Sequence, residues 1–146
     1  MRAVIRTVRE DAELAPKALY LAGKSMGGRV ASHVVAQGEP CQGLIFLGYP
    51  LHPAKQFDKR RVEHWAGLSC PVLFVLGTRD ALCDLGLLKS ELPRISAPVT
   101  LHVVEGGDHS FKVSKSAGKS QQDIWREVDL AIATWITGHD IQHLGA

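Results

Sequence analysis

A serine at position 25 lies in the run GKSMG, residues 23–27, which fits the pattern Gly-x-Ser-x-Gly. The run follows an apolar segment directly and precedes a helical pattern directly. A strand, a sharp turn and a helix form the context in which such a serine is lifted into an exposed, strained position. The run therefore predicts a nucleophile or, as the function-neutral alternative, a glycine turn that lets a strand and a helix pack closely.

Two further residues have the types that a nucleophilic serine needs. Asp80 comes just after the apolar run PVLFVLG, and His109 comes just after the run VTLHVV. An imidazole accepts the serine proton, and a carboxylate orients the imidazole. Because active sites of open parallel sheets lie at the carboxyl ends of the strands, we expect Ser25, Asp80 and His109 to converge at one edge of a sheet.

Other acids and histidines have more ordinary interpretations. Asp84 is a second candidate acid, but we expect it to cap the helix that follows, and Asp108 to stabilise its turn. His102 lies inside a predicted strand and is expected to be structural. His139 and His143 are four residues apart but have neither a glutamate partner nor a third ligand. We therefore predict no metal and no cofactor.

The segment GYPLHP offers two candidates for the wall of a substrate pocket, Tyr49 and His52. His52 follows the second apolar run and is expected at the same sheet edge as Ser25. A loop histidine between two prolines is, however, more often a residue of a rigid turn.

Four apolar runs of strand length must position these residues, at 18–22, 43–48, 71–77 and 99–104. The first three are nearly continuous rather than alternating, which indicates strands covered on both faces. Roughly twenty or more residues separate successive runs, enough for crossover helices. We expect an α/β fold with a parallel sheet of about four strands and flanking helices.

Helical spacing of apolar residues predicts the flanking helices at 26–37, 85–92 and 121–137. Gly138 is the expected stop of the last helix. A weaker amphipathic pattern covers residues 4–12 and ends near Pro16.

A chain of 146 residues with 45% hydrophobic residues suits one domain with one core. The net charge is only +2 and the basic residues are scattered, so nucleic acid is not an expected partner. Neither a signal-peptide core nor an apolar run of ~18 residues is present, which predicts no membrane association and a cytoplasmic protein. Cys41, Cys70 and Cys83 are far apart in the sequence and are expected to be buried free thiols.

Four segments together resemble the α/β-hydrolase superfamily: GKSMGGRVAS, GLIFLGYPLHP, PVLFVLGTRD and GGDHSF. More narrowly, they look like the bacterial dienelactone-hydrolase-like branch, which is related to a testis-expressed hydrolase of animals and a scaffold subunit of a chromatin complex. The resemblance covers residues 18–136. It implies Ser25 as nucleophile, Asp80 as acid, His109 as base and the backbone amide of Met26 as one oxyanion donor.

The resemblance also implies that strands are missing before Ser25, because the family places its serine turn after the fifth of eight strands. We therefore expect residues 1–146 to form a single, N-terminally incomplete domain, the C-terminal part of an α/β-hydrolase fold. The family's second oxyanion amide comes from the missing region, and losing one such donor costs ~10²- to 10³-fold in turnover. The strand from Ala18 to Ala22 has no charge or proline to protect an edge, so we expect self-association through it. A strictly monomeric mass at high concentration would contradict that expectation.

Two functions remain open at this stage. The leading one is a serine hydrolase that acts on a small-molecule carboxylic ester or related acyl compound through an acyl-enzyme. The alternative is a catalytically silent α/β-hydrolase-like interaction or scaffold module that retains the triad residues.

Overall fold

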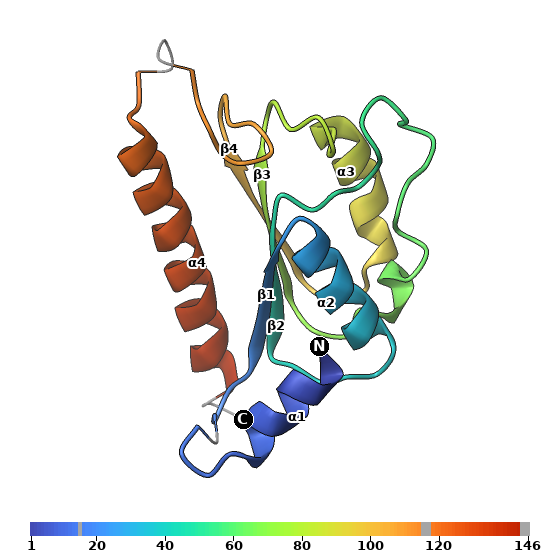
Figure 1. Ribbon diagram of the computed structural model, residues 1–146, viewed down its shortest axis with the longest axis vertical. Helices are drawn as coiled ribbons and strands as arrows, with labels where there is room; N and C mark the ends of the chain where they lie inside the picture. The colour runs from blue at the N-terminus through green and yellow to red at the C-terminus, as the bar shows by residue number, and fades with distance from the viewer. Residues whose placement is uncertain (15, 115–117, 144–146) are drawn as a thin grey trace.

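A four-stranded parallel sheet forms the centre of the molecule (Figure 1). The computed structural model describes residues 1–14, 16–114 and 118–143, with side chains as far as His139. The strands lie side by side in chain order: β1 (Tyr20–Lys24), β2 (Gly43–Leu47), β3 (Val72–Gly77) and β4 (Val99–Val104). The predicted α/β fold with about four parallel strands is confirmed.

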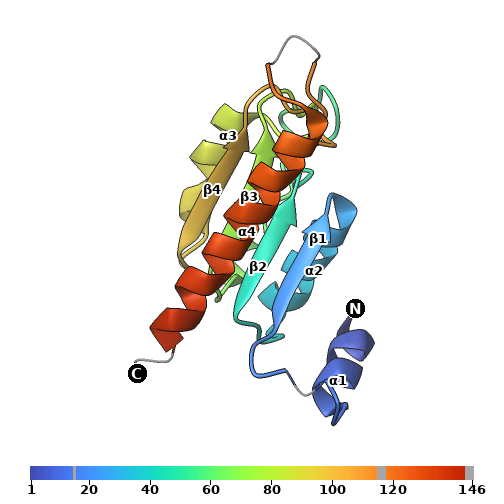
Figure 2. The same cartoon turned by 90° about the vertical axis from the view of Figure 1, so that its left-hand side faces the viewer.

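Helices cover both faces of this sheet. The α-helices are α1 (Arg2–Glu10), α2 (Met26–Ala36), α3 (Leu85–Glu91) and α4 (Gln121–His143), with short 3-10 turns η1 (Trp65–Gly67) and η2 (Leu92–Arg94). Because the strands advance across the sheet in one direction, crossovers of one hand place α2 and α3 on the same face. The other face is left to α4, which crosses it from end to end (Figure 2).

The core is divided between these two faces by the alternation of side chains along β2 and β3. Leu44 and Phe46 pack on the side of α2 and α3, whereas Ile45 between them packs on the side of α4. All six residues of β3 are buried. A nearly continuous apolar sequence is what such a two-sided strand needs, so the interpretation of residues 71–77 is confirmed.

The first strand differs from its prediction in position and in burial. It begins and ends two residues later than expected, and of its five residues only Leu21 is buried, while Ala22 and Lys24 are exposed. The physical reason is its place at the edge, where β2 is its one strand partner among the described residues. Self-association through residues 18–22 stays a prediction.

The last helix continues past its predicted stop. It includes Gly138, whose backbone does not adopt a positive φ, and the helix ends at His143. A glycine stops a helix through the left-handed conformation, and a helical glycine costs only ~1 kcal/mol against alanine. Within the ranges that the structure describes, no helix is both long enough and apolar enough to cross a membrane.

Candidate active site

Ser25 occupies a strained turn between β1 and α2. Its φ of 51° and ψ of −118° lie outside the regions that ordinary residues favour, and its backbone N–H donates to Leu47 O at 2.9 Å. Such a conformation persists only where the surroundings impose it. Because β1 ends directly before Ser25 and α2 begins directly after it, the predicted strand, turn and helix context is present.

Two glycines make this turn sterically possible. A Cβ on Gly23 would lie 2.3 Å from the carbonyl carbon of Gly27 and from the nitrogen of Gly28. A Cβ on Gly28 would lie 2.8 Å from the carbonyl oxygen of Gly23. Gly27, in contrast, has open space where its Cβ would be. The close approach of β1 to α2 therefore depends on Gly23 and Gly28, and Gly28 lies outside the Gly-x-Ser-x-Gly pattern itself.

Ser25, His109 and Asp80 form one hydrogen-bonded chain. His109 Nε2 lies 2.9 Å from Ser25 Oγ, and His109 Nδ1 lies 2.8 Å and 3.0 Å from the two carboxylate oxygens of Asp80. In the tautomer that suits both contacts, Nδ1–H donates to Asp80 and Nε2 accepts the hydroxyl proton of Ser25. The structure thus brings together three residues that are 84 positions apart at their extremes.

The loop after β3 holds the carboxylate of Asp80 in place. Asp80 is 6% exposed, and its Oδ1 also accepts the backbone N–H of Leu82 at 2.8 Å. The turn begins at Gly77, where a Cβ would lie 2.2 Å from the carbonyl oxygen of Gly107. This contact between the loops after β3 and β4 sets the acid and the histidine side by side.

The loop after β4 presents His109 over the end of β2. Asp108 organises it by accepting the backbone N–H groups of Ser110 at 2.7 Å and Lys112 at 2.9 Å, so its predicted turn-stabilising role is confirmed. Gly48, with φ of 63°, lies beneath the ring, and a Cβ there would lie 3.4 Å from His109 Nδ1 and Cε1. The positive φ favours glycine at position 48, and a Cβ there would also lie only 3.1 Å from the carbonyl oxygen of His109.

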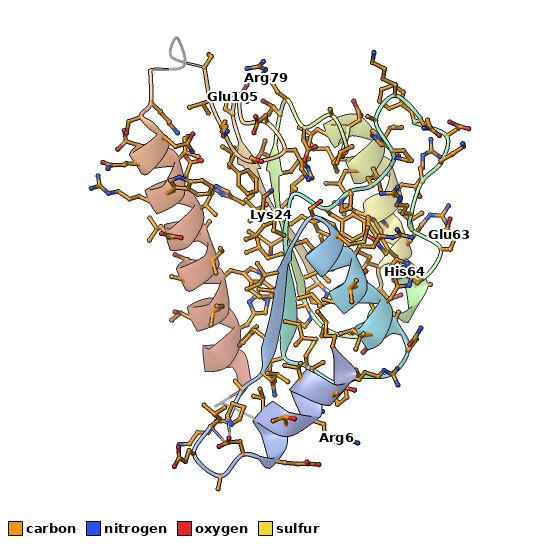
Figure 3. The ribbon with its side chains drawn as sticks, in the orientation of Figure 1. Arg6, Lys24, Glu63, His64, Arg79 and Glu105 are labelled. Carbon is orange, nitrogen blue, oxygen red and sulfur yellow. The ribbon has the colours of Figure 1, made fainter. Side chains whose placement is uncertain are left out.

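Lys24 connects the serine turn to the histidine loop, and the sequence analysis assigned it no role. Its Nζ donates to the carbonyl oxygen of His109 at 2.6 Å and lies 5.2 Å from the ring centre of Phe111, a cation–π distance. Figure 3 shows Lys24 where β1 ends. Desolvation lowers the pKa of Lys24, against the opposing fields of Asp80 and Asp108. The one feature of the sequence that could have drawn attention to Lys24 is its position inside the Gly-x-Ser-x-Gly motif, directly before Ser25.

Tyr49 and His52 are both buried and have hydrogen-bond partners inside the protein. Tyr49 is 1% exposed, and its hydroxyl donates to the backbone of Arg61 and accepts from the indole of Trp65. His52 is fully buried, and its Nε2 accepts the backbone N–H of Asp84 at 3.2 Å. Both side chains thus hold the segment after β2 from inside, which favours the rigid-turn interpretation of His52. A substrate contact for either residue stays a prediction.

The remaining candidates have structural partners. Asp84 caps α3 by accepting the backbone N–H of Leu87 at 2.8 Å, as predicted. His102, on β4, lies 3.3 Å from the carboxylate of Glu127. His139 Nδ1 bonds the carbonyl oxygen of Trp135, and the side chain of His143 lies outside the described residues. No group of three metal-ligating side chains occurs in the described part of the chain.

A second serine–histidine contact lies within the molecule and lacks the features of the first. Ser32 Oγ lies 2.6 Å from His64 Nε2, but Ser32 is fully buried inside α2 and its hydroxyl donates to the carbonyl oxygen of Arg29. His64 Nδ1 is buried without a hydrogen-bond partner, so no carboxylate orients this ring. Burial, with the nearby charges of His33 and Arg29, lowers the pKa of His64 to about 4. Ser32 therefore serves as an internal reference for Ser25.

Met26 follows Ser25 as the first residue of α2. The backbone N–H groups of the first helical turn have no acceptor within the helix. The N–H of Met26 is therefore free, as far as the helix is concerned, to donate to an oxygen near Ser25. A partial positive charge at the helix start favours an anion there.

Comparison with known proteins agrees with this geometry. The model of a protein family described as an alpha/beta hydrolase domain matches residues 1–137. An alpha-beta serine hydrolase homologue from Coxiella burnetii superposes with a TM-score of 0.58 at 26% identity, covering 74% of this chain and 48% of that one. The chain thus spans about half the length of this structural relative.

Two more distant structures share the fold. The esterase domain of a Rhodothermus marinus protein has a TM-score of 0.68 at 15% identity, covering 92% of this chain and 65% of that one. A dienelactone hydrolase from Anabaena variabilis has a TM-score of 0.60 at 18% identity, covering 85% of this chain and 51% of that one.

Proposed function

The chain belongs to the alpha/beta hydrolase domain family, and from this membership we propose that it is a serine hydrolase of carboxylic esters or related acyl compounds. The observation that carries the proposal is the chain of hydrogen bonds from Ser25 through His109 to Asp80, at 2.9 Å and 2.8 Å. The distances suit proton transfer without rearrangement. The strained backbone of Ser25 supports the same conclusion, because strain of this kind gathers at functional sites.

The proposed reaction has two halves. Ser25 Oγ attacks the acyl carbon while its proton passes to His109 Nε2, and Asp80 stabilises the imidazolium through Nδ1. The N–H of Met26 donates to the oxyanion that develops on the former carbonyl. The imidazolium then protonates the leaving alcohol, which departs and leaves the acyl group on Ser25. Water attacks this ester with His109 as base, and Ser25 is released.

The burial of Asp80 and the exposure of Ser25 suit the different roles that this proposal gives them. Asp80 is 6% exposed, so its charge acts on Nδ1 with little screening by solvent. Ser25 is only half-buried and Met26 is 58% exposed, which leaves the nucleophile open to a substrate from outside.

The proposal is tested by labelling with a fluorophosphonate probe and by hydrolysis of a p-nitrophenyl ester. We expect Ser25→Ala to abolish labelling and to lower turnover by about 10⁴-fold or more. His109→Ala should lower turnover by nearly as much. Ser32→Ala is the matched control, since it removes the serine of the other serine–histidine contact and should leave labelling at Ser25 intact.

Absence of Ser25-dependent labelling in a folded chain would overturn the hydrolase proposal. That outcome would favour the alternative, an α/β-hydrolase-like interaction or scaffold module.

A further inference from the structure

Two of the three cysteines meet at the end of the sheet opposite Ser25. Cys41 lies two residues before β2 and Cys70 two residues before β3, and their sulfur atoms are 3.3 Å apart. The sheet causes this meeting, because β2 and β3 pair in parallel with Leu44 opposite Val72. Segments that lead into neighbouring parallel strands start side by side. The two cysteines differ by 29 in residue number, so their contact could not be predicted from their spacing in the sequence.

We propose that Cys41 and Cys70 are a peroxide-sensitive thiol pair that closes to a disulfide within one chain. The thiolate of Cys41 attacks one oxygen of hydrogen peroxide, breaks the O–O bond and becomes a sulfenic acid, releasing hydroxide. The sulfur of Cys70 then attacks the sulfenic sulfur. The displaced hydroxyl leaves as water with the proton of the Cys70 thiol. Two thiols lose two electrons, and one peroxide becomes two waters.

The surroundings of the two sulfurs assign these roles. Cys41 is partly exposed and lines a cavity of about 310 Å³ that also contains the side chains of Arg9 and Lys17. The hydrogen bond with Cys70 lowers the pKa of the Cys41 thiol, helped by the Gly43 amide and Arg9 against burial. A thiolate that a small oxidant can reach is the reactive form of cysteine.

Cys70 is the protected partner. It is 5% exposed, and the same hydrogen bond together with burial raises the pKa of its thiol far above the usual range. Such a thiol does not meet oxidants in solution, but it already touches the atom that it must attack. The order of events therefore runs from Cys41 to Cys70.

Cys83 provides a control within the same chain. Burial raises the pKa of its thiol to about 12, and its side chain is 2% exposed in the loop after Asp80. It has the same chemistry as Cys41 and Cys70 but neither the access nor the partner sulfur. The proposal therefore predicts oxidation of two cysteines out of three.

The disulfide would close a loop of residues 41–70, which contains β2 and η1 and ends just before β3. A covalent bond between two such points removes conformations from the unfolded chain. We expect the melting temperature of the oxidised protein to exceed that of the reduced protein by about 5–10 °C. Because the pair lies away from Ser25, fluorophosphonate labelling should be the same in both forms.

The test treats the full chain with a small excess of hydrogen peroxide at neutral pH and counts free thiols after denaturation. We expect the count to fall from three to one. A tryptic digest should contain residues 30–55 joined to residues 62–79, while the peptide 80–89 with Cys83 remains alkylated. Dithiothreitol should restore all three thiols.

Matched variants separate this reaction from general oxidation. Cys41→Ser and Cys70→Ser should each abolish the linked peptide, and Cys83→Ser should leave it unchanged. In Cys70→Ser a dimedone adduct should accumulate on Cys41, because no resolving thiol remains. A disulfide between two chains, oxidation of Cys83 at a similar rate, or three unreactive thiols in the wild-type protein would each overturn the proposal. All of these readouts are independent of hydrolase activity.

Discussion

The first and third strands of the sheet look alike in sequence and differ in the folded chain. Both are apolar runs, and each is followed by a residue of the proposed triad, Ser25 after β1 and Asp80 after β3. All residues of β3 are buried, whereas β1 buries only Leu21. The proposed nucleophile therefore follows a largely unburied strand, and the proposed acid follows a fully buried one.

This difference indicates that different interactions fix the positions of Ser25 and Asp80. Around Asp80, position comes from tertiary packing, since the loop after β3 is pressed against the loop after β4 at Gly77 and Gly107. Around Ser25, position comes from local backbone sterics, because Gly23 and Gly28 let β1 and α2 approach each other. Mutations of the two strands should consequently affect different properties.

The largest expected effect is on stability, in a comparison of two leucines that belong to the same core cluster. Leu76 in β3 is 1% exposed and Leu21 in β1 is 9% exposed. We expect Leu76→Ala to lower the free energy of unfolding by about 3–4 kcal/mol and Leu21→Ala by about 2 kcal/mol. Urea unfolding followed by circular dichroism measures both. An equal decrease in the free energy of unfolding for both variants would show that β1 is as firmly packed as β3 and would contradict the difference inferred here.

The same contrast separates what the sequence predicts from what it does not. The strands predicted at 43–48, 71–77 and 99–104 were located to within one residue at each end, because apolar runs of this length indicate strands. The last of them, β4, lies at the other edge of the sheet and buries only Val104. The run at 18–22 has the same composition, but its burial depends on which strands lie beside it, and one sequence does not reveal its neighbours. Edge and centre therefore cannot be distinguished from the residues of a strand alone.

In the candidate site, too, some features could be predicted from the sequence and others could not. The sequence predicts that Ser25, Asp80 and His109 lie close together, because each follows a predicted strand and a parallel sheet places the carboxyl ends of its strands at one edge. Lys24 was missed because a lysine at that position reveals nothing until the loop of His109 folds over it. The burial of His52 was not predicted either, because its place after β2 does not reveal the direction of its ring.

The second prediction concerns the glycines that hold the turn of Ser25. In Gly23→Ala the new methyl group would meet backbone atoms of α2 at 2.3 Å, so the helix start and Ser25 must shift. A displacement of about 1 Å can cost ~10²-fold in rate, and we expect the rate of fluorophosphonate labelling to fall by that factor. Gly27→Ala is the control, since its Cβ points into open space within a helix. It should keep the rate and raise stability by about 0.5–1 kcal/mol. Similar rates in the two variants would remove the steric account of the turn.

The smallest effect is expected at Lys24, whose side chain joins the end of β1 to the loop of His109. Lys24→Met keeps a flexible side chain of similar length but removes the hydrogen bond to the carbonyl oxygen of His109 and the cation–π contact with Phe111. Since the ammonium is partly open to solvent, we expect a loss of about 1 kcal/mol, seen as a five- to tenfold slower labelling of Ser25. Lys112→Met, at an exposed lysine of the same loop, should leave the rate unchanged. A purely structural role would lower the melting temperature of Lys24→Met without slowing the labelling of the folded fraction. A slower rate at an unchanged melting temperature would identify Lys24 as a positioning residue, through which the loosely packed edge strand holds the base against its own serine.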